Sequence, residues 1–285
     1  MQDLHFTTYL KEILHLNNRS YIDKIIGGRH LLRALFFACL ITVMTSCSFV
    51  SLERKDIIVH NDEILETSNN DYLDQLEKNA SIYISSNKNS IVKLSRRSNK
   101  YLENIITNII DNNELLLPSA KKISVYIINE KAPFIFSFPG YKIFISKGLI
   151  KKYLTNESIL ICALAYEVIK SGRNMYERNT YIPTGFLDTK KISTMVRINS
   201  KNRLIIFKWT FIALQRANYD ATAVLNWIQT INRNNTEFSW QIGDSKGVLG
   251  EEFQFKTFLA SQGLEINSDG AFNSSRNFYL LRGGI

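Results

Sequence analysis

The sequence predicts an α+β domain in which several helices pack on a small β-sheet. Long apolar segments with helical periodicity indicate the helices, and short segments of alternating β-branched or aromatic residues between 123 and 146 indicate the sheet. The chain has 285 residues, of which 45% are hydrophobic and 12% aromatic. This composition is sufficient for one sizeable core.

The elements can be assigned in chain order. Apolar spacing predicts helices at 71–85, 91–112, 147–154, 159–171, 204–229 and 251–262. Strands are predicted at 123–128, 134–138 and 142–146, with Pro139-Gly140 as the turn between the last two. Asn112-Asn113 and Gly172 are expected to end their helices.

Residues 1–47 have the features of an export or anchor segment. Arg29, His30 and Arg33 precede the apolar run 34–44, which is shorter than the roughly 20 residues that a spanning helix needs. Small residues then lead to Cys47, as in a bacterial lipobox, and this predicts that Cys47 is lipidated. The alternative is a plain anchor helix, because residues 34–52 carry no charge.

Either alternative predicts a protein of the cell envelope, attached to a membrane and facing the periplasm or exterior. Residues 48–70 are polar and are expected to form a tether, so the folded domain spans 71–285. Ser48, which follows the cysteine, favours the outer membrane. The formal net charge is +9, but the basic residues are scattered and no nucleic-acid-binding motif accompanies them, so no nucleic-acid partner is expected.

The most recognisable motif is Ala165-Tyr166-Glu167-Val168-Ile169-Lys170, which follows Phe134 to Gly140 and Ser146-Lys147-Gly148-Leu149 along the chain. The order and spacing of these parts resemble the HtpX/CAAX-protease type of zinc metallopeptidase, most of all its lipoprotein members of the BepA and LoiP type. The resemblance covers roughly residues 91–230. It implies a zincin-like fold and hydrolysis of peptide bonds in or beside a membrane.

In that family, two histidines four residues apart bind zinc and the glutamate between them polarises water. Here Tyr166 and Lys170 occupy the histidine positions and only Glu167 is retained. Alignment on Arg216 puts Tyr219 at the position of the third ligand, and a shift of one residue puts Asn218 or Asp220 there.

These substitutions predict that no metal cofactor is bound. A lysine with an ordinary pKa near 10.4 is protonated and repels a cation, and a tyrosine with a pKa near 10 is a poor ligand. Lys170 stands three residues after Glu167, so its ammonium can pair with the carboxylate in a buried pocket. Glu167 is thus expected to be a vestige of the catalytic site.

Three functions remain open. The first is a catalytically degenerate peptidase-like lipoprotein that binds a polypeptide or envelope partner through the strands of 134–146. The second is a divergent metalloendopeptidase that uses Glu167 with non-standard ligands, and the third is a structural protein with a collapsed cleft. No histidine follows His60, which excludes a Ser-His or Cys-His catalytic couple within the domain. Cys162 is expected to be a buried small hydrophobe.

Overall fold

The computed structural model describes residues 57–60, 69–118, 122–177, 179–182, 187–243, 246–262 and 274–285. All of these belong to one compact unit, Asp56–Ile285. The predictions made for residues 1–47, including lipidation of Cys47, lie outside the described residues. Within the predicted tether, Ile57–His60 forms a strand.

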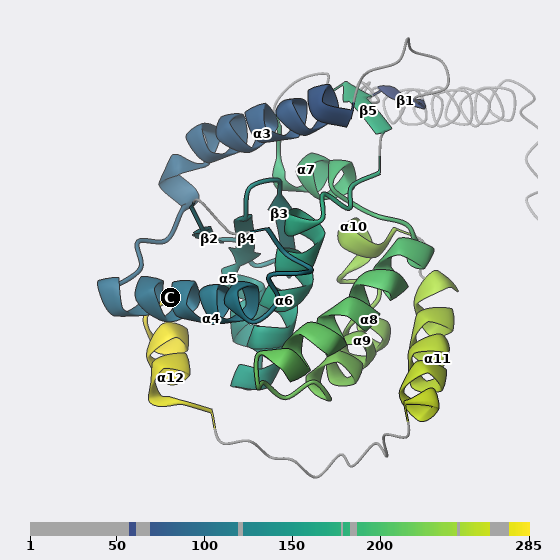
Figure 1. Ribbon diagram of the computed structural model, residues 1–285. Helices are drawn as coiled ribbons and strands as arrows, with labels where there is room; N and C mark the ends of the chain where they lie inside the picture. The colour runs from purple at the N-terminus through teal and green to yellow at the C-terminus, as the bar shows by residue number, and fades with distance from the viewer. Residues whose placement is uncertain are drawn as a thin grey trace, which may run out of the picture. The chain divides into compact units, whose positions relative to one another are not determined.

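The described elements confirm the α+β class, with helices packed on a small sheet (Figure 1). The strands are β1 (Ile57–His60), β2 (Ser124–Ile128), β3 (Ile135–Phe138), β4 (Lys142–Ser146) and β5 (Asn179–Ile182). The helices are α3 (Asn69–Ser86), α4 (Arg96–Asp111), α5 (Lys147–Lys152), α6 (Glu157–Gly172), α7 (Thr189–Met195), α8 (Ser200–Arg216), α9 (Ala223–Arg233), α10 (Ser239–Ile242), α11 (Lys246–Ser261) and α12 (Arg276–Gly283). A short 3₁₀ helix, η3 (Lys88–Ser90), precedes α4.

The central sheet has the strand order β2-β4-β3. Strand β2 runs parallel to β4, with Tyr126 opposite Phe144, and β3 runs antiparallel to β4, with Phe136 opposite the same Phe144. Strand β3 is therefore an edge strand of this sheet. A separate antiparallel ladder joins β1 to β5.

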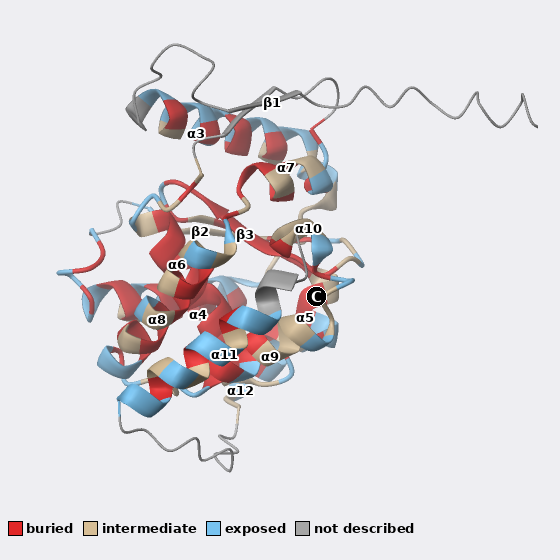
Figure 2. Ribbon diagram, turned by 90° about the vertical axis from the view of Figure 1, so that its right-hand side faces the viewer, coloured by how far each residue is buried: buried red, intermediate tan, exposed pale blue. Residues whose placement is uncertain are grey.

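Helices cover both faces of the central sheet. On one face, α3 and α7 pack over aromatic side chains of the strands, where the ring of Tyr83 lies 5.8 Å from Phe136 and 5.3 Å from Phe144. On the other face α6 contacts β3 and β4, and α4, α8 and α9 surround α6. Helix α6 is thus the centre of the larger core (Figure 2).

Each predicted helix differs from the observed one by one residue or more at one or both ends. The helix predicted at 91–112 begins at Arg96, because Ser95 accepts a hydrogen bond from the amide of Ser98 and caps the helix there. The helix predicted at 251–262 begins earlier, at Lys246. The predicted helix 204–229 is wrong as one element: it is α8 and α9, separated by a turn in which Asn218 adopts a left-handed φ of 58°. Within the described part of the chain, no helix is both long and apolar enough to cross a membrane.

Candidate functional site

The candidate site lies on α6, next to the edge strand β3. Asn156 caps this helix by accepting a hydrogen bond from the amide of Ile159, and every residue from Ile159 to Ser171 is buried. A helix that is apolar on all sides belongs at the centre of a core, and α6 occupies that place. Glu167 and Lys170 are the charged residues within this buried stretch.

Glu167 and Lys170 form a buried ion pair. The Lys170 Nζ atom lies 2.5 Å from Oε2 of Glu167, and the residues are 4% and 2% exposed. Ser137 on β3 donates its hydroxyl to the same Oε2 at 2.7 Å. The ring of Tyr176 lies 5.9 Å from the ammonium, close enough for a cation–π contact. The predicted pairing of Lys170 with Glu167 is confirmed.

Tyr166, at the other histidine position, is packed as an aromatic core residue. Its ring centroid is 4.8 Å from that of Phe207 on α8. Burial raises the pKa of Tyr166 well above its ordinary value, and the negative charge of Glu167 raises it further. The side chain is therefore a neutral phenol, which is a poor ligand for a metal ion.

Tyr219 is not brought together with Glu167. Burial raises the pKa of Tyr219, and the other groups that act on it are the side chains of Asn108 and Glu157. Glu157 is the first residue of α6, ten residues before Glu167, which corresponds to roughly 15 Å along a helix. Tyr219 therefore belongs to the opposite end of α6.

The alternative third-ligand positions have local structural roles. The carboxylate of Asp220 accepts hydrogen bonds from the amide and the hydroxyl of Thr222, just before α9. Asn218 makes the left-handed turn after α8. Neither role involves Glu167.

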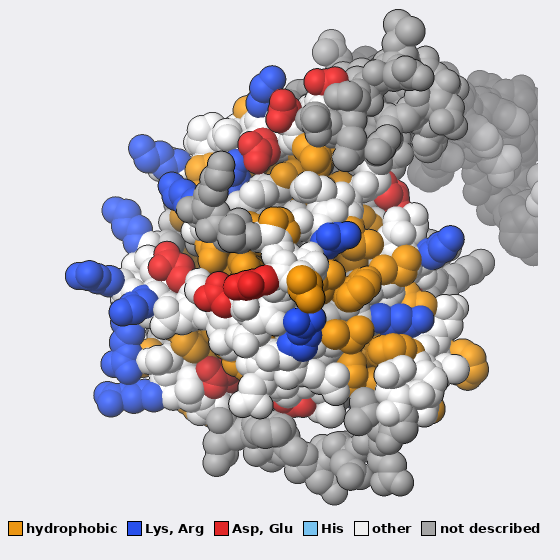
Figure 3. Space-filling model, viewed as in Figure 1, with side chains coloured by type: hydrophobic (Ala, Val, Ile, Leu, Met, Phe, Trp, Pro, Cys, Tyr) orange, Lys and Arg blue, Asp and Glu red, His pale blue; other side chains and the backbone are white. Residues whose placement is uncertain are grey.

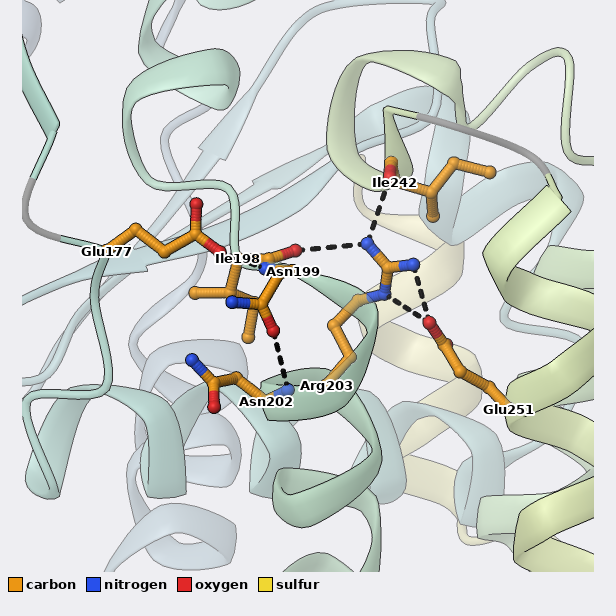
Figure 4. Close-up of polar contacts among 7 residues, drawn as sticks. All are labelled: Glu177, Ile198, Asn199, Asn202, Arg203, Ile242 and Glu251. Atoms are coloured by element: carbon orange, nitrogen blue, oxygen red, sulfur yellow. Dashed lines mark hydrogen bonds and ion pairs between the residues drawn. The ribbon is translucent and has the colours of Figure 1, made fainter. Parts of the chain in front are cut away.

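The later helices instead bring a second buried ion pair to this region. Arg203 on α8 donates through Nε and Nη2 to Oε1 of Glu251 on α11, at 2.9 and 2.5 Å. Its Nη1 donates to the carbonyls of Ile198 and Ile242 (Figure 4). This pair was not predicted from the sequence, because Arg203 stands beside Lys201 and Asn202 in the polar first turn of α8 and does not stand out there.

Residues of both ion pairs line a small cavity. The walls of the cavity are formed by β3, α6, α7, α8, α9 and α10. Its lining residues include Glu167, Lys170, Ser193, Arg203 and Trp227. Its volume is about 50 Å³. That is room for a few water molecules, at roughly 10–15 Å³ each, and far below the roughly 300–1,000 Å³ of small-molecule pockets. The cavity beside Glu167 therefore has no room for a small-molecule ligand.

The outward edge of β3 is occupied by a side-chain amide. Gln241 of α10 accepts a hydrogen bond from the amide of Ile135 at 3.3 Å and donates one to the carbonyl of Pro133, also at 3.3 Å. A neighbouring β-strand would offer the same donor and acceptor groups. Gln241 thus occupies part of the edge at which an added strand would pair.

The donor set beside Glu167 does not fit zinc. Among the described residues, no three histidine, cysteine, aspartate or glutamate side chains are grouped so that they could hold a metal ion. Glu167 itself is neutralised by an ammonium, and Tyr166 is a neutral phenol. Cys162 is fully buried, and burial raises the pKa of its thiol, in agreement with its predicted role as a core residue.

No protein-family model matches the chain, and no curated protein matches it either. The resemblance to zinc metallopeptidases therefore stays a prediction, based on the motifs between Ile123 and Lys170. The residues that carry it lie together on β3, β4, α5 and α6.

Proposed function

We propose that this chain is a catalytically degenerate, peptidase-like protein of the cell envelope, in which an internal ion pair occupies the position of the metal. The observation that carries the proposal is the contact of Lys170 with Glu167 at 2.5 Å in a buried site. An ammonium there supplies positive charge to the carboxylate and prevents a metal ion from approaching it. No hydrolytic step follows from this arrangement.

We further propose that the domain has a zincin-like fold. In the family that the motifs resemble, an edge strand borders the cleft and the helix with the metal ligands lies beneath it. In this chain β3 is an edge strand of its sheet and packs directly on α6. The hydroxyl of Ser137 on β3 reaches Glu167 on α6, which ties the two elements together.

The zinc content of the purified full-length chain tests the loss of the metal site. After brief incubation with zinc and desalting, we expect folded protein without bound metal. Near-stoichiometric zinc would refute the proposal and favour a metalloendopeptidase with ligands of another kind. In that case Glu167→Gln should abolish any peptidase activity.

The proposed activity is binding of an extended polypeptide by strand addition to β3. The support is that the edge amide of Ile135 and the carbonyl of Pro133 are bonded to a side chain, which a peptide backbone can replace. Because the side chains of β3 are buried, Gln241 and α10 must move aside for a peptide to pair. The free chain is then a closed form.

Replacing the competing amide tests this activity. Gln241→Ala removes both competing hydrogen bonds, each worth about 1 kcal/mol, so a fluorescent, permanently unfolded polypeptide should bind about thirtyfold more tightly. Gln254→Ala, on the exposed face of α11, is the matched control and should leave the affinity unchanged. Fluorescence anisotropy gives the affinities.

The small volume of the cavity favours one rival, a purely structural protein with a collapsed cleft. The same titration separates the two functions. If neither the natural chain nor Gln241→Ala binds the polypeptide, the edge is not a binding site and the structural function stands. Binding that is equal in the two chains would place the polypeptide elsewhere on the surface.

A further inference from the structure

The described surface contains a basic face formed by α4, α5 and α12, which the proposed function does not use. Lysine and arginine side chains gather along the left edge of the molecule, where α4 begins and α12 lies (Figures 1 and 3). We define the basic face by Arg96, Arg97, Lys100, Lys151, Arg276 and Arg282.

Contacts between the elements place these residues side by side. The Arg97 guanidinium on α4 donates to Oδ1 of Asn277 on α12 at 2.9 Å. Arg282, on the last turn of α12, donates to the carbonyl of Lys151 on α5 at 2.9 Å, and Lys151 donates back to the carbonyl of Arg282. Helix α12 therefore lies between the cations of α4 and those of α5.

The positive charge of the basic face is not compensated locally. Among the described residues, no carboxylate forms an ion pair with any of its six cations. The nearby acid Glu157 is bonded to Tyr101 and Ser275 instead, and Glu103 is one exposed acid on α4. A surface of this kind attracts an extended array of negative charge.

Helix α12 also projects apolar side chains from the middle of the basic face. Arg276, Tyr279 and Leu280 lie three and four residues apart, so they share one side of the helix. Tyr279 is 59% exposed and Leu280 is 41% exposed. Phe278 and Leu281 on the opposite side are fully buried and hold the helix against the core.

We propose that the basic face docks on the surface of an anionic lipid bilayer, with Tyr279 and Leu280 inserted at the level of the headgroups. Tyrosine is favoured at membrane interfaces, and each nearby lysine or arginine adds attraction to anionic lipid. A nucleic acid would find a single exposed aromatic side chain there, Tyr279, for its bases to stack on. Docking would orient the domain on a membrane to which the amino-terminal segment is predicted to attach it.

Hydrogen–deuterium exchange of the full-length chain tests the proposal, because every sample keeps the same amino-terminal attachment. The chain is reconstituted in vesicles of phosphatidylcholine, or of phosphatidylcholine with about one-third phosphatidylglycerol. We expect the amides of α12 to exchange about tenfold more slowly on the anionic vesicles, because docking prevents this short helix from fraying. High salt should remove the difference. The amides of α11 should not change.

Two triple variants test whether the protection depends on the basic face or only on the net charge of the protein. The first removes three exposed cations of the basic face and should abolish the protection; it combines Arg96→Gln, Lys100→Gln and Arg276→Gln. The second removes three exposed cations from other helices and should retain the protection; it combines Lys78→Gln, Lys190→Gln and Lys201→Gln. Equal loss in both variants, or protection on neutral vesicles, would overturn the proposal. Equal protection by soluble DNA would also overturn it and indicate a nucleic-acid partner.

Discussion

Replacing Lys170 by methionine tests whether the buried ion pair holds the site together. The substitution keeps most of the side-chain volume but leaves the carboxylate of Glu167 buried, with the Ser137 hydroxyl as its one remaining hydrogen-bond partner among the described residues. Removing one member of a buried pair costs about 3–5 kcal/mol. Because domains are stable by only about 5–15 kcal/mol, the loss should lower the urea midpoint substantially. Tryptophan fluorescence can follow unfolding, since Trp227 lines the same cavity.

The double variant Glu167→Gln with Lys170→Met gives the decisive comparison. It removes both charges and keeps an amide that Ser137 can contact, so most of the lost free energy of unfolding should return. Lys256→Met is the control, because its pair with Glu252 is 44% exposed on the lysine side and should be worth less than about 1 kcal/mol. A cost below about 1 kcal/mol for Lys170→Met, or a double variant no more stable than that single one, would refute the reasoning.

Two other predictions concern packing and pH. In Gly148→Ala the new Cβ would lie 1.9 Å from the carbonyl oxygen of Lys131, so thermal unfolding should show a loss of roughly 1–3 kcal/mol or more. Gly250→Ala, with open space around it in α11, should instead gain about 0.5–1 kcal/mol. Burial raises the pKa of Tyr83 from 10.0 to about 12, and the hydrogen bond between its hydroxyl and that of Thr189 lowers the pKa by less than burial raises it. The fold therefore favours the neutral phenol: this stabilisation is complete below pH 10 and is lost, by roughly 3 kcal/mol, as the pH rises to 12. Urea unfolding across this range should show a smaller loss in Tyr83→Phe, and an equal loss would contradict the prediction.

Local sequence patterns predicted the elements around the site but not their partners. The strand at 142–146 has its predicted bounds, and α6 extends the predicted 159–171 by one or two residues at each end. Both are short-range features that apolar periodicity and helix caps encode. The pairing of Lys170 with Glu167 was predictable for the same reason, because three residues along a helix bring two side chains to one face.

The rest of the site depends on contacts between distant parts of the chain. Ser137 meets Glu167 across 30 residues, and Arg203 meets Glu251 across 48. A serine in a strand and an arginine in a helix have many possible partners, and a single sequence does not select among them. The break at Asn218 was missed for a related reason: the apolar spacing of α8 continues into α9, so periodicity alone predicts one helix.

The two buried ion pairs explain how this apolar core can contain two glutamates. Glu167 and Glu251 are 2% and 3% exposed, and an unpaired carboxylate at either position would cost several kcal/mol. Lys170 and Arg203 pair with these carboxylates, and both cations line one small cavity. This charge balance also constrains the proposed peptide binding. A peptide that opened the cleft between β3 and α10 would have to leave both pairs intact, so it should contact the strand edge and not reach Glu167.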